Sequence, residues 1–250
     1  MTPPVAAYLA RLGDDRLVLG HRLSEWCGHG PILEEDIALT NIALDLIGQA
    51  NLLLGLAGAA EGQGRDQDAL AYFREAVEYR NALIVELPKG DFAFTIVRQF
   101  LFSVFAYLQL DALRQSANTE LAGIAGKAVK EVKYHVRHSA DWMIKLGDGT
   151  ADSHHRTQRA VDDIWRYTGE LFLADDVDLA AVAAGVGVDP SSLEESWRSH
   201  VDDVFGRATL TVPEVKFMQR GGRTGKHTEH LGHMLAEMQI VARSFPGGSW

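Results

Sequence analysis

Apolar residues recur at three- and four-residue steps along nearly the whole chain, and this spacing constrains the fold more than any other feature of the sequence. Such a repeat places apolar side chains on one face of an α-helix, whereas a half-buried strand would alternate every second residue. Only the stretch 207–215, RATLTVPEV, has the β-branched alternation of an extended segment, and Pro213 disfavours a central strand there. The sequence therefore predicts an all-α protein.

Helix-capping residues mark the ends of the expected helices. Asp91 can cap one helix at its N-terminus, Asn118 or Thr119 can cap the next, and Gly147 can end that helix. The expected helical ranges are 4–12, 14–27, 33–58, 67–86, 92–115, 119–146, 156–173, 190–205 and 227–244.

Four consecutive long segments have the lengths and short connections of an antiparallel helix bundle, around which the other helices would pack. These segments are 33–58, 67–86, 92–115 and 119–146. With 250 residues and 46% hydrophobic content, the chain can bury a large core without a disulfide or a metal ion. We expect one helical domain over residues 1–250, with the bundle core at 33–146.

Composition and charge narrow the class of protein. The single cysteine, Cys27, allows no intrachain disulfide, fits a reducing compartment and is expected to be a buried structural thiol. Arg11, Asp14 and Asp15 interrupt the N-terminal apolar residues too early for a signal peptide, and no stretch approaches roughly 18 apolar residues. A net charge of −10 disfavours binding to nucleic acid or to an anionic membrane. We expect a cytoplasmic protein.

Acids and histidines lie at helical spacing along several segments, as they do in helix-bundle oxygenases. A carboxylate-bridged di-iron bundle takes a glutamate from each of two helices and a Glu-x-x-His pair from each of the other two. The pattern Glu-x-x-His does not occur in this sequence. The chain therefore has the features of the scaffold without a complete set of ligands, and no catalytic residue is expected in it.

A polar stripe in segment 33–58 is the first half of a possible degenerate site. Asn41, Asp45 and Gln49 follow one another at four-residue steps in a helix that is otherwise apolar nearly all round. A buried polar stripe needs partners. Asp45 could lie where a bundle carboxylate would hold a metal ion.

The matching half lies in segment 119–146, where polar residues share one broad face: Glu131, Tyr134, His135, His138 and Asp141. Two readings stay open for Asp45 and Glu131. They could hold a metal, or nearby cations could neutralise them as ion pairs. The cations available for this are Arg98, Lys130, Lys133 and Arg137. We expect a metal-free, hydrogen-bonded remnant made of Asp45, Glu131, His135 and His138.

Two other groups of residues have ligand-like spacing. His227, His230, His233 and Glu237 are candidates for zinc, but His-x-x-His-x-x-His drifts around a helix, so capping, packing or hydrogen bonding is the expected role. The pair Asp152 and His155 lies in GDGTADSHH, which we expect to be a solvated turn.

Four long stretches are distinctive enough to carry a family resemblance: RLSEWCGHGPILEEDIALTNIALDLIGQA, KAVKEVKYHVRHSADWMIKLGDGT, IWRYTGELF and GKHTEHLGHMLAEMQ. They closely resemble the C subunits of bacterial phenylacetyl-CoA 1,2-epoxidases, the multicomponent ring oxygenases of phenylacetate degradation. The likeness covers nearly the whole chain. It implies a ferritin-like four-helix bundle with additional peripheral helices.

The resemblance also implies partners and cofactors outside this chain. A homologous catalytic A subunit would carry the di-iron centre, and a small B subunit and an iron-sulfur flavin reductase would complete the system. The reductase would hold FAD and an iron-sulfur cluster and would take electrons from NADPH. In this family the C subunit is regarded as non-catalytic and as a structural support of the A subunit, which agrees with the missing Glu-x-x-His pairs.

Direct contact with the acyl-CoA is expected at the end of segment 67–86. Glu78, Tyr79, Arg80 and Asn81 offer a cation, an aromatic ring and an amide close together, although a solvated helix face would explain the same residues. Two other functions stay open. The chain could be an autonomous di-iron enzyme that uses the four remnant residues, Asp45, Glu131, His135 and His138, which predicts iron in the isolated chain. It could instead be a free-standing acyl-CoA binding protein, which predicts tight CoA binding without a partner.

Overall fold

The computed structural model describes residues 3–248, and helices are the only regular secondary structure within that range. The chain divides into two compact units, each described here by itself. Unit one contains the chain up to Pro88 and the C-terminal segment from Gly221, whereas unit two contains Lys89–Arg220. The all-α class is confirmed. The single domain expected over the whole chain stays a prediction.

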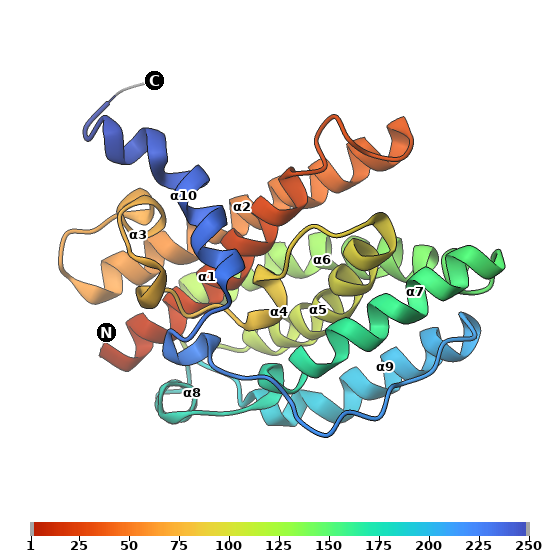
Figure 1. The fold of residues 1–250 in the computed structure, drawn as a ribbon. Coiled ribbons are helices and arrows are strands. Elements are labelled where there is room, and N and C mark those ends of the chain that lie inside the picture. The colour runs from red at the N-terminus through yellow and green to blue at the C-terminus, as the bar shows by residue number, and fades with distance from the viewer. Residues whose placement is uncertain (1–2, 249–250) are drawn as a thin grey trace. The chain divides into compact units, whose positions relative to one another are not determined.

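Unit one is built on two long helices that pack side by side and run antiparallel, α1 and α2 (Figure 1). The shorter helices α3, α4 and α10 pack against this pair or against each other. The elements of unit one are α1 Pro3–Ser24, α2 Leu33–Glu61, α3 Gln67–Tyr72, η1 Ala76–Glu78, α4 Leu83–Glu86, η5 Gly222–Thr224 and α10 Glu229–Ser244, where η denotes a 3₁₀ helix.

The first helix is one continuous element rather than the two that the sequence predicts. Gly13 does not break it, because this glycine is the point at which α1 approaches α2: a Cβ there would lie 2.7 Å from Leu54 Cδ2. The helix ends at Ser24, short of the expected residue 27. Cys27 therefore falls in the following turn and is exposed, so the prediction of a buried thiol is wrong.

The expected bundle helix 67–86 does not form. The chain leaves the helix after Tyr72, makes one 3₁₀ turn at η1 and becomes extended at Tyr79. The physical reason is tertiary: the backbone N–H groups of Arg80 and Ala82 donate to carboxylates of α1 and not to helix carbonyls. These hydrogen bonds outweigh the helical spacing of the side chains. The four long segments predicted as a bundle are therefore wrong in their second member.

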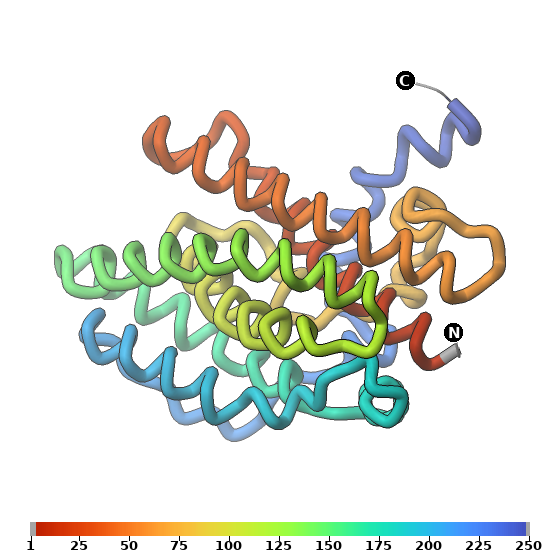
Figure 2. The backbone as a smooth tube through the Cα atoms, turned by 180° about the vertical axis from the view of Figure 1, so that it is seen from behind, coloured from red at the N-terminus to blue at the C-terminus, as the bar shows by residue number. Residues whose placement is uncertain are grey.

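Unit two is built on another pair of long helices, α5 and α6, which also pack side by side (Figure 2). Asp91 and Asn118 cap them as expected, through side-chain oxygens that accept from the N–H groups of Phe94 and Leu121. The elements are α5 Phe92–Leu113, α6 Thr119–Gly147, α7 Ala151–Ile164, η2 Trp165–Tyr167, η3 Gly169–Phe172, α8 Asp176–Ala183, η4 Pro190–Leu193 and α9 Glu194–Arg207.

Three details of unit two differ from the sequence prediction. Asp152 and His155 lie in the first turns of α7 and not in a loop, because Thr150 and Ser153 form a capping box that starts the helix early. Helix α8 is not among the predicted helices. The expected helix 156–173 ends at Ile164 and continues as two 3₁₀ turns.

Aromatic side chains form much of the core of unit two. Trp165 and Trp197 are buried with ring centroids 5.7 Å apart, and both contact neighbouring phenylalanines. The indole N–H of Trp197 donates to the carbonyl of Leu101 at 2.9 Å, which fixes α9 against α5. A buried indole needs such a partner.

Two helices, α2 and α5, are long and apolar enough to cross a membrane if only length and composition are considered. In α5, 83% of the most apolar window is buried inside the protein, as in the core helix of a soluble domain. In α2 the buried share is 56%, and several of its large apolar side chains are exposed: Leu33, Ile37, Leu44 and Leu52. The expectation that the protein has no contact with a membrane stays a prediction.

Candidate functional site

The four residues of the predicted remnant site fall in different units. Asp45 lies on α2 in unit one, whereas Glu131, His135 and His138 lie on α6 in unit two. Within residues 3–248, no group of three or more histidine, cysteine, aspartate or glutamate side chains is placed to hold a metal ion. The remnant as a joint site therefore stays a prediction.

On α6 itself, these residues have distinct surroundings. His135 is buried, whereas Glu131 is half-buried and its carboxylate lies 3.9 Å from the ammonium of Lys127. The ring of Tyr134 lies over the same face, with its centroid 6.4 Å from that of His135 and 5.8 Å from that of His138. These residues therefore lie on one continuous helix, and their role as a site stays a prediction.

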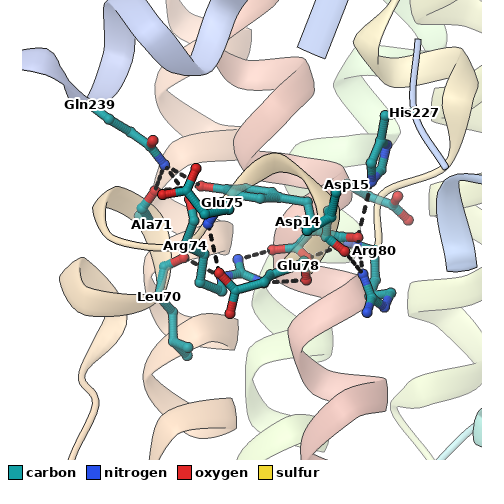
Figure 3. Close-up of polar contacts among 12 residues, drawn as sticks. Asp14, Asp15, Leu70, Ala71, Arg74, Glu75, Glu78, Arg80, His227 and Gln239 are labelled. Atoms are coloured by element: carbon teal, nitrogen blue, oxygen red, sulfur yellow. Dashed lines mark hydrogen bonds and ion pairs between the residues drawn. The ribbon is translucent and has the colours of Figure 1, made fainter. Parts of the chain in front are cut away.

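A different group of acids forms a buried ionic site in unit one. Asp14 and Asp15 on α1 and Glu86 on α4 are each 0% exposed, and we call these three residues the carboxylate cluster. A buried carboxylate is stable only when cations and hydrogen-bond donors surround it. Figure 3 shows the part of this network around Asp14, with Arg74 and Arg80 beside it.

Asp14 is held by an arginine from the chain after α3. The guanidinium of Arg74 binds both carboxylate oxygens, through a close ion pair at Oδ1 and a 3.1 Å hydrogen bond to Oδ2. The backbone N–H of Arg80 donates to Oδ2 at 2.9 Å. Burial opposes the charge of Arg74, but the charge and hydrogen bonds of Asp14 outweigh this effect and raise the pKa of the guanidinium. Arg74 is therefore permanently cationic.

Asp15 is held by the C-terminal segment. Arg223 in η5 forms a bidentate pair with it, Nη1 to Oδ1 at 2.9 Å and Nη2 to Oδ2 at 2.8 Å. The N–H of Ala82 adds a 2.7 Å hydrogen bond to Oδ1. Residues more than two hundred positions apart in the sequence are thus joined inside one unit.

Glu86 is held by a histidine and two further donors. His227 Nδ1 lies 2.7 Å from Oε2, Asn81 Nδ2 donates to the same oxygen at 2.8 Å, and the N–H of Thr228 donates to Oε1 at 2.6 Å. The second ring nitrogen of His227 lies 3.0 Å from the carbonyl oxygen of Tyr79. Both ring nitrogens therefore face acceptors, and only the doubly protonated imidazolium can donate to both.

The pKa of His227 follows from these contacts. Burial lowers it, but the hydrogen bond to Glu86 and the charge of that carboxylate have the larger combined effect, so the pKa lies above its ordinary value of 6.5. Folding therefore stabilises the imidazolium form relative to the neutral ring.

A tyrosine and a glutamine extend the network toward α10. The Tyr79 ring lies under the guanidinium of Arg74, 4.2 Å from ring centroid to Cζ, and its hydroxyl donates to the carbonyl of Ala71. Gln239 on α10 donates to that carbonyl at 3.0 Å and to the Tyr79 hydroxyl at 3.2 Å. Burial raises the pKa of the Tyr79 phenol, so this hydroxyl stays protonated.

The arrangement of the carboxylate cluster gives it a structural role. Each carboxylate already accepts from a cationic side chain and from at least one backbone N–H, so its charge is compensated within unit one. A general base or a nucleophile needs a free lone pair directed at a substrate, which these saturated oxygens do not offer. The cluster fixes α3, α4 and the C-terminal segment to α1.

The four predicted acyl-CoA contacts lie inside or beside this network. Tyr79 and Asn81 are fully buried and serve the cluster, so neither side chain is at the surface. Glu78 is exposed and Arg80 is half-buried, and both line a cavity of about 390 Å³ together with alanines from α1 and α2. Only Glu78 and Arg80 are placed to meet a ligand. The assignment of all four residues to substrate stays a prediction.

The three C-terminal histidines separate in space. His227 precedes α10 and pairs with Glu86, His230 is half-buried near the start of α10, and His233 is exposed. Hydrogen bonding is therefore the observed role of His227, in agreement with the expected alternative to zinc.

Sequence reasoning missed the carboxylate cluster. In the sequence, Asp14 and Asp15 were considered only as residues that interrupt an apolar N-terminus. Two adjacent acids inside a helix that is otherwise largely apolar are, however, a signal of buried ion pairs. A second signal is the glycine-rich GGRTG at 221–225, where a Cβ on Gly222 would meet the carbonyl oxygen of Asn81. A glycine is needed for that close approach.

Comparison with known proteins shows the family to which the chain belongs. A sequence model of the phenylacetic acid catabolic protein family matches residues 1–250, and the chain belongs to this family. The fold of the family is ferritin-like and all-α, so the predicted fold class is confirmed. The chain is 46% identical, over 246 residues, to the C subunit of 1,2-phenylacetyl-CoA epoxidase from Escherichia coli (strain K12). The alignment covers 98% of this chain and 99% of the relative, which confirms the resemblance found in the sequence.

Proposed function

We propose that this chain is a non-catalytic subunit of a 1,2-phenylacetyl-CoA epoxidase, and that it supports the structure of a homologous di-iron A subunit in the cytoplasm. The proposal is supported by the 46% identity to the C subunit of such an enzyme over essentially the full length of both chains. The sequence lacks any Glu-x-x-His pair, and the buried carboxylates of unit one are already paired with cations. The chain is thus suited to hold a partner rather than a di-iron centre.

The observation that carries the proposal is an apolar stripe on the outer face of α2. Leu33, Ile37 and Leu44 follow one another at four- and seven-residue steps, so they share one face of the helix. Leu33 is 72% exposed, Ile37 53% and Leu44 61%, while Leu46 on the opposite face is buried. Exposed aliphatic side chains in a row at helical spacing are typical of helices that dock on another protein.

We infer that a helix of the A subunit packs against this stripe. Each aliphatic side chain removed from water contributes about 1.5–3 kcal/mol when it becomes fully buried. An obligate subunit interface is more apolar than ordinary surface, as this stripe is. The other partners in this proposal are a small B subunit and a reductase with FAD and an iron-sulfur cluster that takes electrons from NADPH.

Substrate contact by this chain is a finer part of the proposal. Arg80 would meet a phosphate of the CoA portion at the mouth of the 390 Å³ cavity, beside Glu78. Its guanidinium currently donates to the carbonyls of Val77 and Tyr79 at 2.6 Å, and it is only half-buried. The Arg80→Ala variant of the assembled enzyme should therefore have a raised KM for phenylacetyl-CoA with kcat little changed. Arg114→Ala, which removes an exposed arginine of unit two, is the matched control.

The deciding experiment is co-expression of the A subunit with this chain, without it, and with the Leu44→Lys variant. We expect soluble, active A subunit only with the wild-type chain, and loss of co-purification with Leu44→Lys. Leu179→Lys, at a 53% exposed leucine on α8, should leave co-purification intact. A soluble and fully active A subunit without this chain would contradict the proposal.

Metal content separates this function from its main alternative. After iron-supplemented expression, iron should be found in the complex and not in the isolated chain. Near-stoichiometric iron in the isolated chain would instead favour an autonomous di-iron enzyme, with Asp45, Glu131, His135 and His138 as the residues to mutate.

A further inference from the structure

Unit two contains a second concave site that the proposed function does not use. It is a cavity of about 540 Å³ between α5, α6 and α9. Ligand sites in proteins are usually clefts of roughly 300–1,000 Å³ with mostly apolar walls and a few polar groups. The lining consists of three cations of α6, two tyrosines, two valines and one histidine.

The cations are the most unusual part of this lining. Lys130, Lys133 and Arg137 are exposed at three- and four-residue steps, so they lie on one face of α6. Within residues 3–248 none of the three forms an ion pair, and the lining contains no carboxylate. Lys127, one turn earlier, differs because it pairs with Glu131 at 3.9 Å. Three uncompensated cations stand out in a chain whose net charge is −10.

The rest of the lining is suited to a flat apolar group. Val104 is buried at 1% exposure and forms part of the wall, and Tyr107 and Tyr134 contribute aromatic rings. The guanidinium of Arg137 lies 5.6 Å from the centroid of the Tyr134 ring, so a cation and a ring are already adjacent. His200 from α9 adds one further polar group.

We propose that this cavity binds a ligand of the nucleoside diphosphate class, with its phosphates at the α6 cations and its base against the tyrosines. Guanidinium and ammonium groups are the usual partners of phosphate oxygens, and an aromatic side chain can stack on any base. Binding would also relieve the mutual repulsion of three like charges. The ligand is either a free nucleotide or the nucleotide portion of a CoA thioester, because both have the same chemistry.

The test is direct binding to the isolated chain, which requires no partner and no turnover. Calorimetric titration with ADP should give saturable binding of one ADP per chain that weakens as salt is raised. Pyrophosphate and adenosine, each with only half of the ligand's chemistry, should bind more weakly than ADP. Lys133→Ala and Arg137→Ala should each weaken ADP binding by about ten-fold, the effect of one charge-assisted hydrogen bond.

Controls make the result specific. Lys127→Ala removes a cation of the same helix outside the cavity and should leave ADP binding unchanged. Lys133→Arg should keep most of the affinity, and Tyr134→Leu should reduce the preference for ADP over pyrophosphate. If CoA displaces ADP, the natural ligand is a CoA thioester. If CoA does not displace ADP, the natural ligand is a free nucleotide.

The proposal is overturned if ADP does not bind, if pyrophosphate binds as tightly as ADP, or if the α6 variants bind ADP like the wild type. None of these outcomes bears on the role of α2 in subunit assembly, so the two proposals fail or survive independently.

Discussion

The ring of His227 donates to Glu86 across 2.7 Å in a place where both side chains are almost excluded from solvent, 5% and 0% exposed. One residue lies just before the last helix and the other in the short helix α4, 141 positions earlier. Because the second ring nitrogen also faces an acceptor, this pair makes the attachment of the C-terminal segment depend on the charge of one histidine.

Stability should therefore fall as the pH rises through the pKa of His227. The folded-state pKa lies above the unfolded value of about 6.5, so the stabilisation is fully present below about pH 6.5 and is lost as the pH rises through the folded-state pKa. Urea unfolding at a series of pH values from about 6 to 9 measures the effect. His227→Gln should remove this decrease, whereas His233→Gln, at an exposed histidine of the same segment, should keep it. Equal slopes for wild type and His227→Gln would contradict the assignment.

Breaking the pair of Asp14 and Arg74 should cost more than removing both partners. Asp14→Leu leaves a buried, permanently charged guanidinium, so the free energy of unfolding should fall by about 3–5 kcal/mol. The double variant Asp14→Leu, Arg74→Met should recover a large part of that loss. Chemical denaturation of the wild type, both single variants and the double variant gives the coupling energy, and additive losses would show that the pair is not coupled.

The two faces of α2 should respond differently to the same substitution. Leu46 is 1% exposed, so Leu46→Ala should lower the free energy of unfolding by about 2–5 kcal/mol. Leu44→Ala, on the exposed stripe, should change it by no more than about 0.5 kcal/mol. Thermal unfolding of the isolated chain is the measurement. A large loss for Leu44→Ala would mean that this face is already covered within the chain.

The glycine-rich turn should not tolerate a side chain at Gly222. A Cβ there would meet the carbonyl oxygen of Asn81, so Gly222→Ala should destabilise the protein by about 1–3 kcal/mol through forced displacement of the backbone. Gly232→Ala is the matched control, because its Cβ would meet nothing within 4 Å, and it should stabilise α10 by about 1 kcal/mol. Denaturation midpoints of the two variants should move in opposite directions.

Several features of the protein could be predicted because they depend only on residues that are close together in the sequence. Helical spacing identified α2, α5 and α6 close to their true bounds, and the caps at Asp91 and Asn118 were predicted correctly. The long family strings gave the family, and the absence of Glu-x-x-His in the sequence is the basis for proposing a supporting role. Each of these inferences rests on local geometry or on the residues themselves.

Features that depend on distant residues were not predictable. Segment 67–86 has the side-chain spacing of a helix, but Asp14 and Asp15 take the N–H groups of Arg80 and Ala82 and hold the chain extended. Arg74, the partner of Asp14 in the carboxylate cluster, carries no sequence signal of its own.

The sequence by itself determined the all-α class, the long helices and the family, because those follow from repeats and strings of neighbouring residues. Only the tertiary structure decided which acids are buried and which cations neutralise them, and it left the cations of α6 around a cavity without counter-charges. The physical reason is that burying a charge is favourable only beside a partner, and the partners here lie up to 208 positions apart in the chain.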